Sequence, residues 1–301
     1  MVYTLGESLV DIIITGDESA TLKAGGGMLN TAVSLARSGI EVSLISETGD
    51  DRIAAFIIDF LKSNHVSAKY VKKYFHQSTT VAMAFLDERN KPEFTIHKSY
   101  PKNRRLIVPE HIEKEDILIF GSLYSLDPAI RVDLLPLLAR ARRSGALIIY
   151  DPNIRKHNLE HDGLREAFRE NVAFADIIKG SDEDMINLFD TKDADECLEN
   201  IREINPSSIF IITRGEEGVT GFSDDRKAVL PSREVKAVST IGAGDAFSAG
   251  LAYYLVNSKQ ANGWNKKTFS LEDMLNTGQS FAASVCGSLE NYVSKDFNFS
   301  L

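Results

Sequence analysis

The residues best suited to chemistry stand in the segment Gly242-Ala243-Gly244-Asp245. Two glycines open an expected helix and let backbone N–H groups converge without side chains in the way. The unpaired N–H groups and partial positive charge of a helix start suit a phosphate or another developing anion. Asp245 would repel a bound anion, so its place needs a reason. A carboxylate beside an anion hole can take the proton from a hydroxyl that attacks a phosphoryl group.

This segment also has a purely structural interpretation, because acidic residues are favoured in the first turn of any helix. It does not fit the two common phosphate loops. The dinucleotide-binding fingerprint requires a third glycine at position 247, where the chain has Phe247. The P-loop requires a Gly-Lys-Ser/Thr triplet, which the sequence does not contain.

A second glycine-rich segment covers residues 25–27 and is followed by Asn30, in a helix expected to end near Gly39. Glycines let backbone amides approach a small polar ligand closely. The amide of Asn30 offers both a donor and an acceptor. The alternative is a flexible glycine hinge with Asn30 on a helix face where its hydrogen bonds are already satisfied.

Short apolar runs alternate with longer segments of helical pattern, such as 127–144 and 163–174. This alternation predicts βαβ units in an α/β fold, with a mainly parallel central sheet and helices on both faces. The runs expected as buried strands are 42–45, 116–120, 146–150, 177–178 and 209–212.

Polar segments follow four of the expected strands, at the strand ends where open α/β sheets bind ligands. We therefore expect them to converge on one edge of the sheet. Each alone could also be a turn or a helix cap; Ser181 with Asp184, for example, fits a capping box. The segments are 151–155, 179–183, 213–218 and the glycine pair at 242–244, which follows an expected strand near 235–238.

Two regions, about 9–23 and 68–100, break the alternation. Strand-like runs at 80–86 and 94–98 are separated by the polar residues 87–91, which suggests a hairpin. We predict a small antiparallel sheet that covers the mouth of the α/β body as a lid. The alternative is an antiparallel edge of the main sheet.

Composition limits the class of protein. The chain has 301 residues and a formal net charge of −9, which argues against a general nucleic-acid-binding surface. Cys197 and Cys286 form no CxxC pair, which argues against a zinc site and for a reducing compartment. The start lacks a basic region, and no apolar run reaches membrane-spanning length. We expect a single cytoplasmic domain over 1–301, without membrane partners.

Together these motifs resemble the ribokinase-like, or PfkB, family of carbohydrate kinases over nearly the whole chain. The opening segment from Gly6 to Asp11 resembles the family's first strand with its sugar-binding aspartate. Residues 25–30 and 242–245 match its two signatures, 48–51 its Gly-Asp-Asp turn and 213–218 its nucleotide-binding turn. The segment Asp151-Pro152-Asn153-Ile154-Arg155 is especially similar to fructokinases and 2-keto-3-deoxygluconate kinases.

The resemblance implies a three-layer ribokinase-like sandwich with a β-sheet lid, and it assigns roles to residues. Asp245 would be the catalytic base, and the segment with Gly242, Ala243 and Gly244 would form the anion hole. Sugar binding falls to Asp11, Gly25, Gly26, Asn30, Asn153 and Arg155. Nucleotide binding falls to Lys179, Thr213, Gly215 and Gly218, and Glu183 would assist Mg²⁺ through water.

This chain departs from the family pattern at several positions. Ser239 replaces an aspartate beside the family's monovalent-cation site, which leaves a requirement for K⁺ open. Gly180 replaces the asparagine of an Asn-x-x-Glu motif, as is common in fructokinases, whereas Glu183 is kept. Met28 and Leu29 replace smaller residues and could reshape the sugar pocket.

The expected activity is transfer of the γ-phosphoryl group of ATP, with Mg²⁺, to a primary hydroxyl of a small sugar, with fructose favoured. Alternatives are a sugar-acid kinase using Arg155 or Lys98, a nucleoside kinase using Phe85 or Phe94, and a non-catalytic sugar-binding protein. The adenine is expected near Gly218 and residues 276–286. A homodimer through the lid is expected, because exposed edge strands invite pairing.

Overall fold

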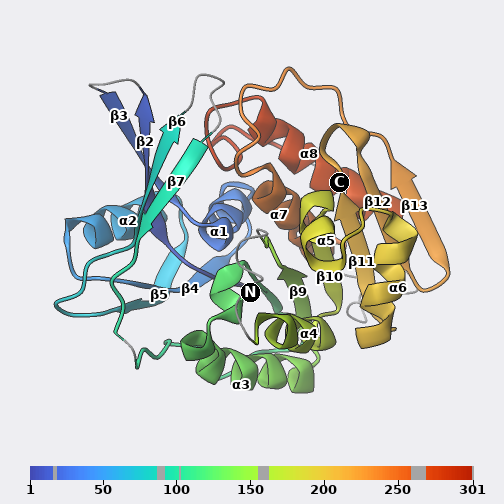
Figure 1. Cartoon of the computed structure of the whole chain (residues 1–301), viewed down its shortest axis with the longest axis horizontal. Helices are drawn as coiled ribbons and strands as arrows, with labels where there is room; N and C mark the ends of the chain where they lie inside the picture. The colour runs from blue at the N-terminus through green and yellow to red at the C-terminus, as the bar shows by residue number, and fades with distance from the viewer. Residues whose placement is uncertain (16–18, 87–91, 102, 155–162, 259–268, 300–301) are drawn as a thin grey trace.

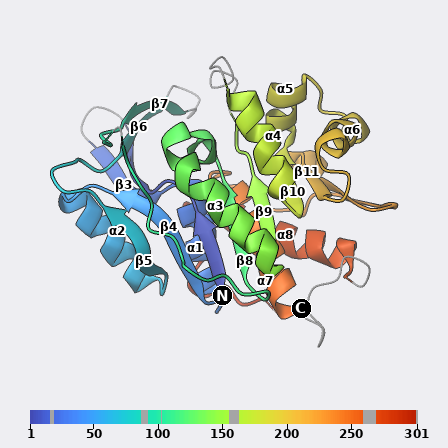
Figure 2. The same ribbon diagram turned by 90° about the horizontal axis from the view of Figure 1, so that it is seen from below.

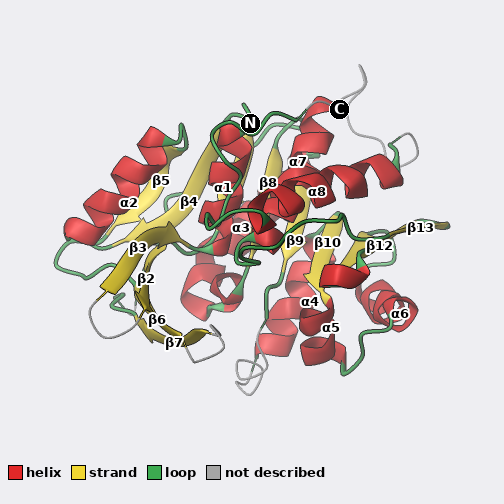
Figure 3. Cartoon of the chain, turned by 90° about the horizontal axis from the view of Figure 1, so that it is seen from above, coloured by secondary structure: helices red, strands yellow, loops and turns green. Residues whose placement is uncertain are grey.

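The computed structural model describes residues 1–15, 19–86, 92–101, 103–154, 163–258 and 269–299. A nine-stranded sheet of order β13-β12-β11-β10-β9-β8-β1-β4-β5 crosses the molecule (Figure 1). Helices cover both of its faces (Figures 2 and 3). The predicted α/β sandwich with a mainly parallel central sheet is therefore confirmed.

Seven strands of this sheet pair in parallel, and all five predicted runs are among them. The five predicted runs are buried on both faces, which explains their nearly continuous apolar sequence. The parallel strands are β1 (Val2–Leu5), β4 (Val42–Thr48), β5 (Ser67–Lys73), β8 (Ile117–Gly121), β9 (Leu147–Asp151), β10 (Ile177–Ser181) and β11 (Ile209–Thr213). The antiparallel edge consists of β12 (Val219–Ser223) and β13 (Arg226–Leu230).

The helices form two layers, each packed on its own apolar core. One layer holds α1 (Gly27–Arg37), α2 (Arg52–Ser63), α7 (Ala243–Asn257) and α8 (Leu271–Cys286). The other holds α3 (Pro128–Ser144), α4 (Leu164–Phe174), α5 (Asp182–Phe189) and α6 (Ala194–Ile204), with the 3₁₀ turns η1 (Leu123–Leu126) and η3 (Gly215–Glu217) at strand ends. Asp127 caps α3, and Ser181 with Asp184 forms the predicted capping box on α5.

A separate four-stranded sheet of order β3-β2-β6-β7 forms the lid, so the alternative of a main-sheet edge is wrong. Its strands are β2 (Leu9–Thr15), β3 (Ser19–Gly25), β6 (Val81–Leu86) and β7 (Pro92–His97). It is not wholly antiparallel, because β2 and β6 pair in parallel. The predicted lid range of 68–100 also starts too early, since β5 pairs with β4 in the main sheet. Figure 3 shows the lid curving away from the body.

The prediction of a strand near 235–238 is wrong. Residues 231–242 form a loop, and Val235 and Val238 are exposed. The N–H of Val238 bonds to the carbonyl of Cys286 at the end of α8, 2.8 Å away. The apolar residues here lie three apart, which is not the alternation of a half-buried strand. The catalytic-type motif thus follows a loop that is braced by the end of α8.

Candidate active site

The glycine pair opens α7, as predicted. Gly242 is the N-cap and has a left-handed backbone with φ +84°. A Cβ atom at this position would lie 2.1 Å from the carbonyl oxygen of Asn291, so both the backbone and the space require glycine. Asp245 stands in the first turn of the helix.

The anion hole is smaller than predicted. The N–H of Ala243 bonds to the carbonyl of Thr240 at 3.2 Å, so this amide is already used. The N–H groups of Gly244 and Asp245 have no partner within the described part of the chain. Gly244 is exposed, so two adjacent donors at a helix start face outward beside a carboxylate. This pair of amides is the part of the predicted anion hole that can receive a phosphoryl oxygen.

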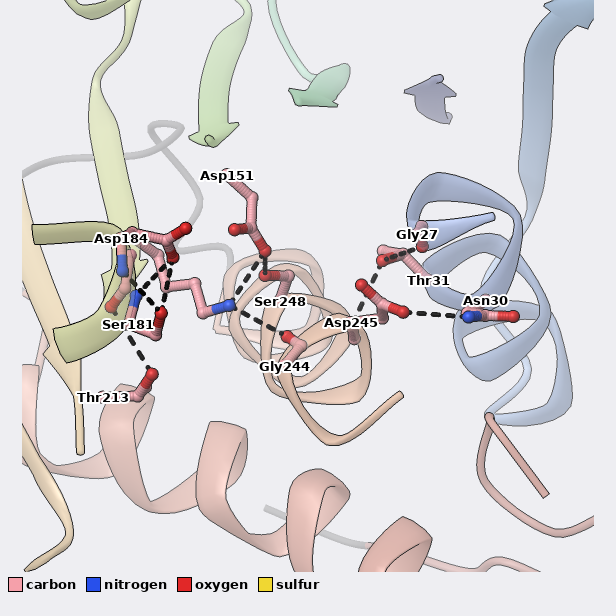
Figure 4. Close-up of polar contacts among 12 residues, drawn as sticks. Gly27, Asn30, Thr31, Asp151, Ser181, Asp184, Thr213, Gly244, Asp245 and Ser248 are labelled. Atoms are coloured by element: carbon pink, nitrogen blue, oxygen red, sulfur yellow. Dashed lines mark hydrogen bonds and ion pairs between the residues drawn. The ribbon is translucent and has the colours of Figure 1, made fainter. Parts of the chain in front are cut away.

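The Asp245 carboxylate is held between α7 and α1. Its Oδ2 accepts a hydrogen bond of 2.9 Å from Asn30 Nδ2, and Thr31 Oγ1 donates to the Asp245 carbonyl at 3.1 Å (Figure 4). A Cβ atom on Gly27 would lie 3.0 Å from Oδ1, so glycine there leaves room for the carboxylate. Burial raises the pKa of Asp245 to about 7, against the lowering effect of the Asn30 bond and Lys179. The group is poised to exchange a proton near neutral pH.

Beneath the start of α7 lies a buried ion pair. Lys179 Nζ is 2.9 Å from Asp151 Oδ2, and the same oxygen accepts a 2.8 Å bond from Ser248 Oγ (Figure 4). Lys179 Nζ also donates to the Gly244 carbonyl at 3.3 Å. Burial alone would lower the pKa of Lys179, but the Asp151 carboxylate outweighs it and the pKa is raised. The lysine predicted to bind nucleotide therefore makes its contacts inside the protein in this structure.

The turn after β9 is fixed by Asp184. Its Oδ1 accepts from the N–H of Ile154 at 2.6 Å, and its Oδ2 accepts from Ser181. Asn153 has φ +43° and is exposed, and its Nδ2 would lie 3.8 Å from a Cβ on Gly27. Asn153 thus faces the region of Asp245, as predicted for a substrate ligand. Arg155, the other predicted ligand of this turn, lies outside the described residues.

The first lid strands bring the predicted sugar ligands to the same region. A Cβ on Gly25 would lie 2.2 Å from Asp11 Oδ2, and one on Gly26, where φ is +115°, would lie 2.2 Å from the Glu7 carbonyl. The Asp11 charge contributes to the raised pKa of Asp245, so the two carboxylates are near neighbours. Lys98 Nζ forms an ion pair with Glu7 at 3.6 Å.

Met28 and Leu29 are not pocket residues. Both are buried in the core beneath α1, and Met28 packs against Gly6. The expectation that they reshape the sugar pocket is therefore wrong, because the side chains point into the sheet layer. Met28 instead fills the space that Gly6 leaves after β1.

The predicted nucleotide turn follows β11. Thr213 Oγ1 donates to the Gly180 carbonyl at 3.4 Å, and the Arg214 N–H bonds to the Gly218 carbonyl at 2.8 Å. Gly215 and Gly218 have φ of +49° and +96°. A Cβ on Gly218 would lie 2.1 Å from the Leu230 carbonyl, so the tight turn depends on that glycine. The turn stands two strands from Asp151 along the sheet.

The predicted metal residue, Glu183, is exposed in the first turn of α5. Within the described residues no group of three or more acidic, histidine or cysteine side chains is arranged to hold a metal ion. A carboxylate that acts through a water molecule requires no such group. Glu183 is exposed and could make such an outer contact, and its role toward a magnesium–phosphate complex stays a prediction.

The Gly-Asp-Asp turn has a structural role. Asp51 caps α2 through the N–H of Ala54 and also accepts from the backbone and side chain of Thr79. Burial would raise the pKa of Asp51, but these hydrogen bonds outweigh it and the pKa is lowered. The turn thus joins α2 to the segment that leads into lid strand β6.

Sequence reasoning missed Ser248 and Thr31, and it placed Asp151 in the site region without a role of its own. Asp151 stands at a strand end, where polar residues were already expected to gather. Ser248 lies one helical turn after Gly244, and such spacing places both on one face of α7. No signal in the sequence pairs Thr31 with Asp245, because that contact depends on how α1 packs against α7.

No helix among the described residues combines the length and apolar content needed to cross a membrane.

Known proteins resemble this chain over most of its length. A fructokinase of Klebsiella pneumoniae is 29% identical over 259 residues, covering 83% of this chain and 82% of the relative. The crystal structure of the Vibrio cholerae O395 fructokinase in its fructose, ADP and calcium ion bound form superposes with a TM-score of 0.85. It is 24% identical and covers 98% of this chain and 95% of that one.

A second fold neighbour is the aminoimidazole riboside kinase of Salmonella enterica, complexed with aminoimidazole riboside and an ATP analogue. Its TM-score is 0.81 at 22% identity, with 98% of this chain and 96% of that chain covered. The model of the pfkB family carbohydrate kinases matches residues 2–295. The fold, the relatives and this match lead to one conclusion: the chain belongs to the pfkB family of carbohydrate kinases and is a sugar-kinase phosphotransferase.

Proposed function

We propose that this kinase transfers the γ-phosphoryl group of ATP to a primary hydroxyl of a neutral sugar, with fructose as the preferred acceptor. The observation that carries the proposal is the Asp245 carboxylate beside the two unpartnered amides of Gly244 and Asp245. The fructokinase relatives support the choice of sugar.

Asp245 acts as the general base. It accepts the proton of the attacking hydroxyl while the oxygen bonds to the γ-phosphorus and the bond to the leaving ADP breaks. A pKa of about 7 suits a base at neutral pH. The two amides stabilise the negative charge on the transferring group, and one such donor lowers the barrier by roughly 3 kcal/mol.

The nucleotide lies between α7 and the 214–218 turn in this proposal, with Gly218 and α8 near the adenine. Glu183 contributes to the magnesium site through water. When bound, Mg²⁺ neutralises charge on the phosphate oxygens. Ser239 supplies a hydroxyl where the family has a carboxylate beside its monovalent-cation site, and assays with and without K⁺ test whether this kinase needs that cation.

Charge in the sugar region favours a neutral acceptor over a sugar acid. Among the described residues it holds the carboxylates of Glu7, Asp11 and Asp245, whereas Lys98 is paired with Glu7. An anionic substrate would add a like charge to this group, which opposes binding. Fructose adds none.

We further propose a cytoplasmic homodimer formed through the lid. Large apolar side chains lie exposed on it: Leu22 at 55%, Phe85 at 45% and Ile96 at 49%. A second copy of the chain would cover them, since exposed apolar patches mark association sites. Sedimentation of the wild type and a Leu22→Lys variant tests this.

The decisive experiment replaces Asp245 by asparagine and follows ADP release with a panel of acceptors: fructose, glucose, 2-keto-3-deoxygluconate and a nucleoside. We expect the wild type to favour fructose and D245N to lose about 10²–10⁴-fold in kcat with an unchanged fold. Asp59→Asn on the exposed face of α2 is the matched control and should retain full activity. Near wild-type turnover by D245N removes the proposed base; preference for another acceptor corrects only the sugar.

A further inference from the structure

We propose that Lys179 is a positioning residue that fixes the first turn of α7, and that it does not bind the nucleotide phosphates. It acts together with Asp151 and Ser248, and these three residues are named the α7 support. The inference rests on the proposed function, because its effect on the reaction passes through Asp245 and the neighbouring amides.

The contacts of the α7 support are internal. Lys179, Asp151 and Ser248 are exposed by only 4%, 2% and 0%. The ammonium is held on two sides, by Asp151 Oδ2 at 2.9 Å and by the Gly244 carbonyl at 3.3 Å. To reach a phosphate it would have to leave Asp151, and the cost of an unpaired buried carboxylate is high. Figure 4 shows Asp151 and Ser248 close to Gly244 at the start of α7.

Lys179 acts on the anion hole through its hydrogen bond to the Gly244 carbonyl. The Gly244 carbonyl and the Asp245 N–H belong to one planar trans peptide and point in opposite directions. A cation that binds the carbonyl therefore sets the direction of that N–H and polarises it as a donor. A Cβ on Gly244 would lie 3.2 Å from Lys179 Nζ, so glycine lets the ammonium approach the peptide.

Ser248 is the third member of the α7 support. It lies one turn along α7 from Gly244 and donates to Asp151 at 2.8 Å. The helix is thus bound to Lys179 directly at Gly244 and through Asp151 at Ser248. Two points of attachment on one helical face fix the position and rotation of the first turn.

The support also sets the charge around the base. Asp245 on α7 faces Asn30 on α1, Asp11 on the lid, Asp151 on β9 and Lys179 on β10, and Asp184 on α5 faces the same lysine. Lys179 is the cation that lowers the pKa of Asp245 here, whereas Asp151 and Asp11 raise it. Loss of the lysine charge raises that pKa, so the base stays protonated to a higher pH. The acid limb of the pH profile of kcat then moves to higher pH.

The experiment compares Ser248→Ala, Lys179→Met and the double variant K179M/D151N, with Ser208→Ala as control. Ser208 is buried and bonds to the Asn205 carbonyl, at the opposite end of β11 from the site. We expect S248A to lower kcat about fivefold with an unchanged KM for ATP. K179M should lose about 100-fold in kcat and shift the acid limb by about one pH unit. The double variant should recover about tenfold over K179M, because no unpaired carboxylate remains.

Two results overturn the proposal. One is a K179M variant with a KM for ATP raised more than about tenfold and an unmoved acid limb, since that is the loss of a phosphate contact. The other is S248A with the kcat of S208A, and this soluble, mild variant decides the matter even where K179M does not fold. D245N is measured beside them. An active D245N defeats the proposed base, whereas an inactive D245N with unaffected S248A defeats only the positioning role.

Discussion

Two buried ion pairs lie at the carboxyl edge of the sheet, and they differ in how completely the carboxylate oxygens are hydrogen-bonded. In the α7 support, Asp151 Oδ2 accepts bonds from both Lys179 and Ser248. Under the segments that join the lid to the body, Glu47 at the end of β4 is fully buried and lies 3.2 Å from Arg104 Nε. Neither Glu47 oxygen has hydrogen-bond geometry with a described residue.

The second pair, named the lid-stem cluster, holds together three parts of the chain. Arg104 lies on the segment that returns from the lid, stacks on Tyr100 and also binds Asp127, the N-cap of α3. Burial raises the pKa of Glu47 to about 7, against the lowering effect of Arg104. Both carboxylates are hidden from water, whereas Arg104 is slightly more exposed than Lys179. Burial alone therefore does not distinguish the α7 support from the lid-stem cluster. The hydrogen-bonded Asp151 gives a fixed geometry, whereas the carboxylate of Glu47, which lacks hydrogen bonds to the described residues, gives an attachment that responds to pH.

Among the variants that test this difference, Arg104→Met should change the free energy of unfolding most. At pH 8 the Glu47 carboxylate is left buried without its cation, and we expect a loss of about 3–5 kcal/mol in the free energy of unfolding. At pH 5.5 the carboxyl takes up a proton and the loss is smaller. Urea unfolding at both pH values measures it. The neighbouring Arg105 has a side chain that is 67% exposed, so Arg105→Met should change stability much less. Equal losses for Arg104→Met at the two pH values would contradict the account.

The next effect is that of Glu47→Gln on the pH dependence of stability. Because the pKa of Glu47 is raised on folding from 4.5 to about 7, the folded state binds more protons in that window. Wild-type stability therefore falls as pH rises from 4.5 through 7, by about 3 kcal/mol from this group. Glutamine cannot ionise, so E47Q removes that part of the decline in urea titrations from pH 5 to 8. A decline as steep as in the wild type assigns it to other groups.

The smallest effect separates two tyrosines of the lid-stem cluster. Tyr100 Oη accepts a 2.8 Å bond from Thr80 Oγ1, so Tyr100→Phe should cost about 1 kcal/mol while it keeps the ring beneath Arg104. Tyr124 Oη is buried without a hydrogen-bond partner in the described structure, so Tyr124→Phe should be nearly neutral. Thermal melts of both variants test the order, and a reversed order means that Tyr124 binds Glu47.

Local signals in the sequence predicted much of the fold. Apolar runs located the parallel strands, and Asp127 and Ser181 marked helix starts, because strand burial and capping depend on neighbours in the chain. The prediction of a strand at 235–238 failed because edge pairing depends on contacts that are distant in the sequence. Here β13 occupies the edge.

The candidate site was predicted in its residue types and less well in its contacts. Asp245, Asn30 and Gly242 come together as expected. The partners of Lys179 could not be predicted, since they require β9 and β10 to be neighbours and α7 to lie across them. The use of the Ala243 amide likewise depends on how the Thr240 carbonyl turns at the cap.

The backbone at Asn291 reaches Gly242, and its neighbours bind the first elements of the chain: Leu289 accepts from Lys23, and Glu290 pairs with Arg37. During synthesis, Asp11 and Asn30 leave the ribosome long before this segment does. The turn at Gly242 thus obtains this support only after the chain has grown about 50 residues further, to Asn291. A chain that ends before Asn291 lacks that brace on Gly242.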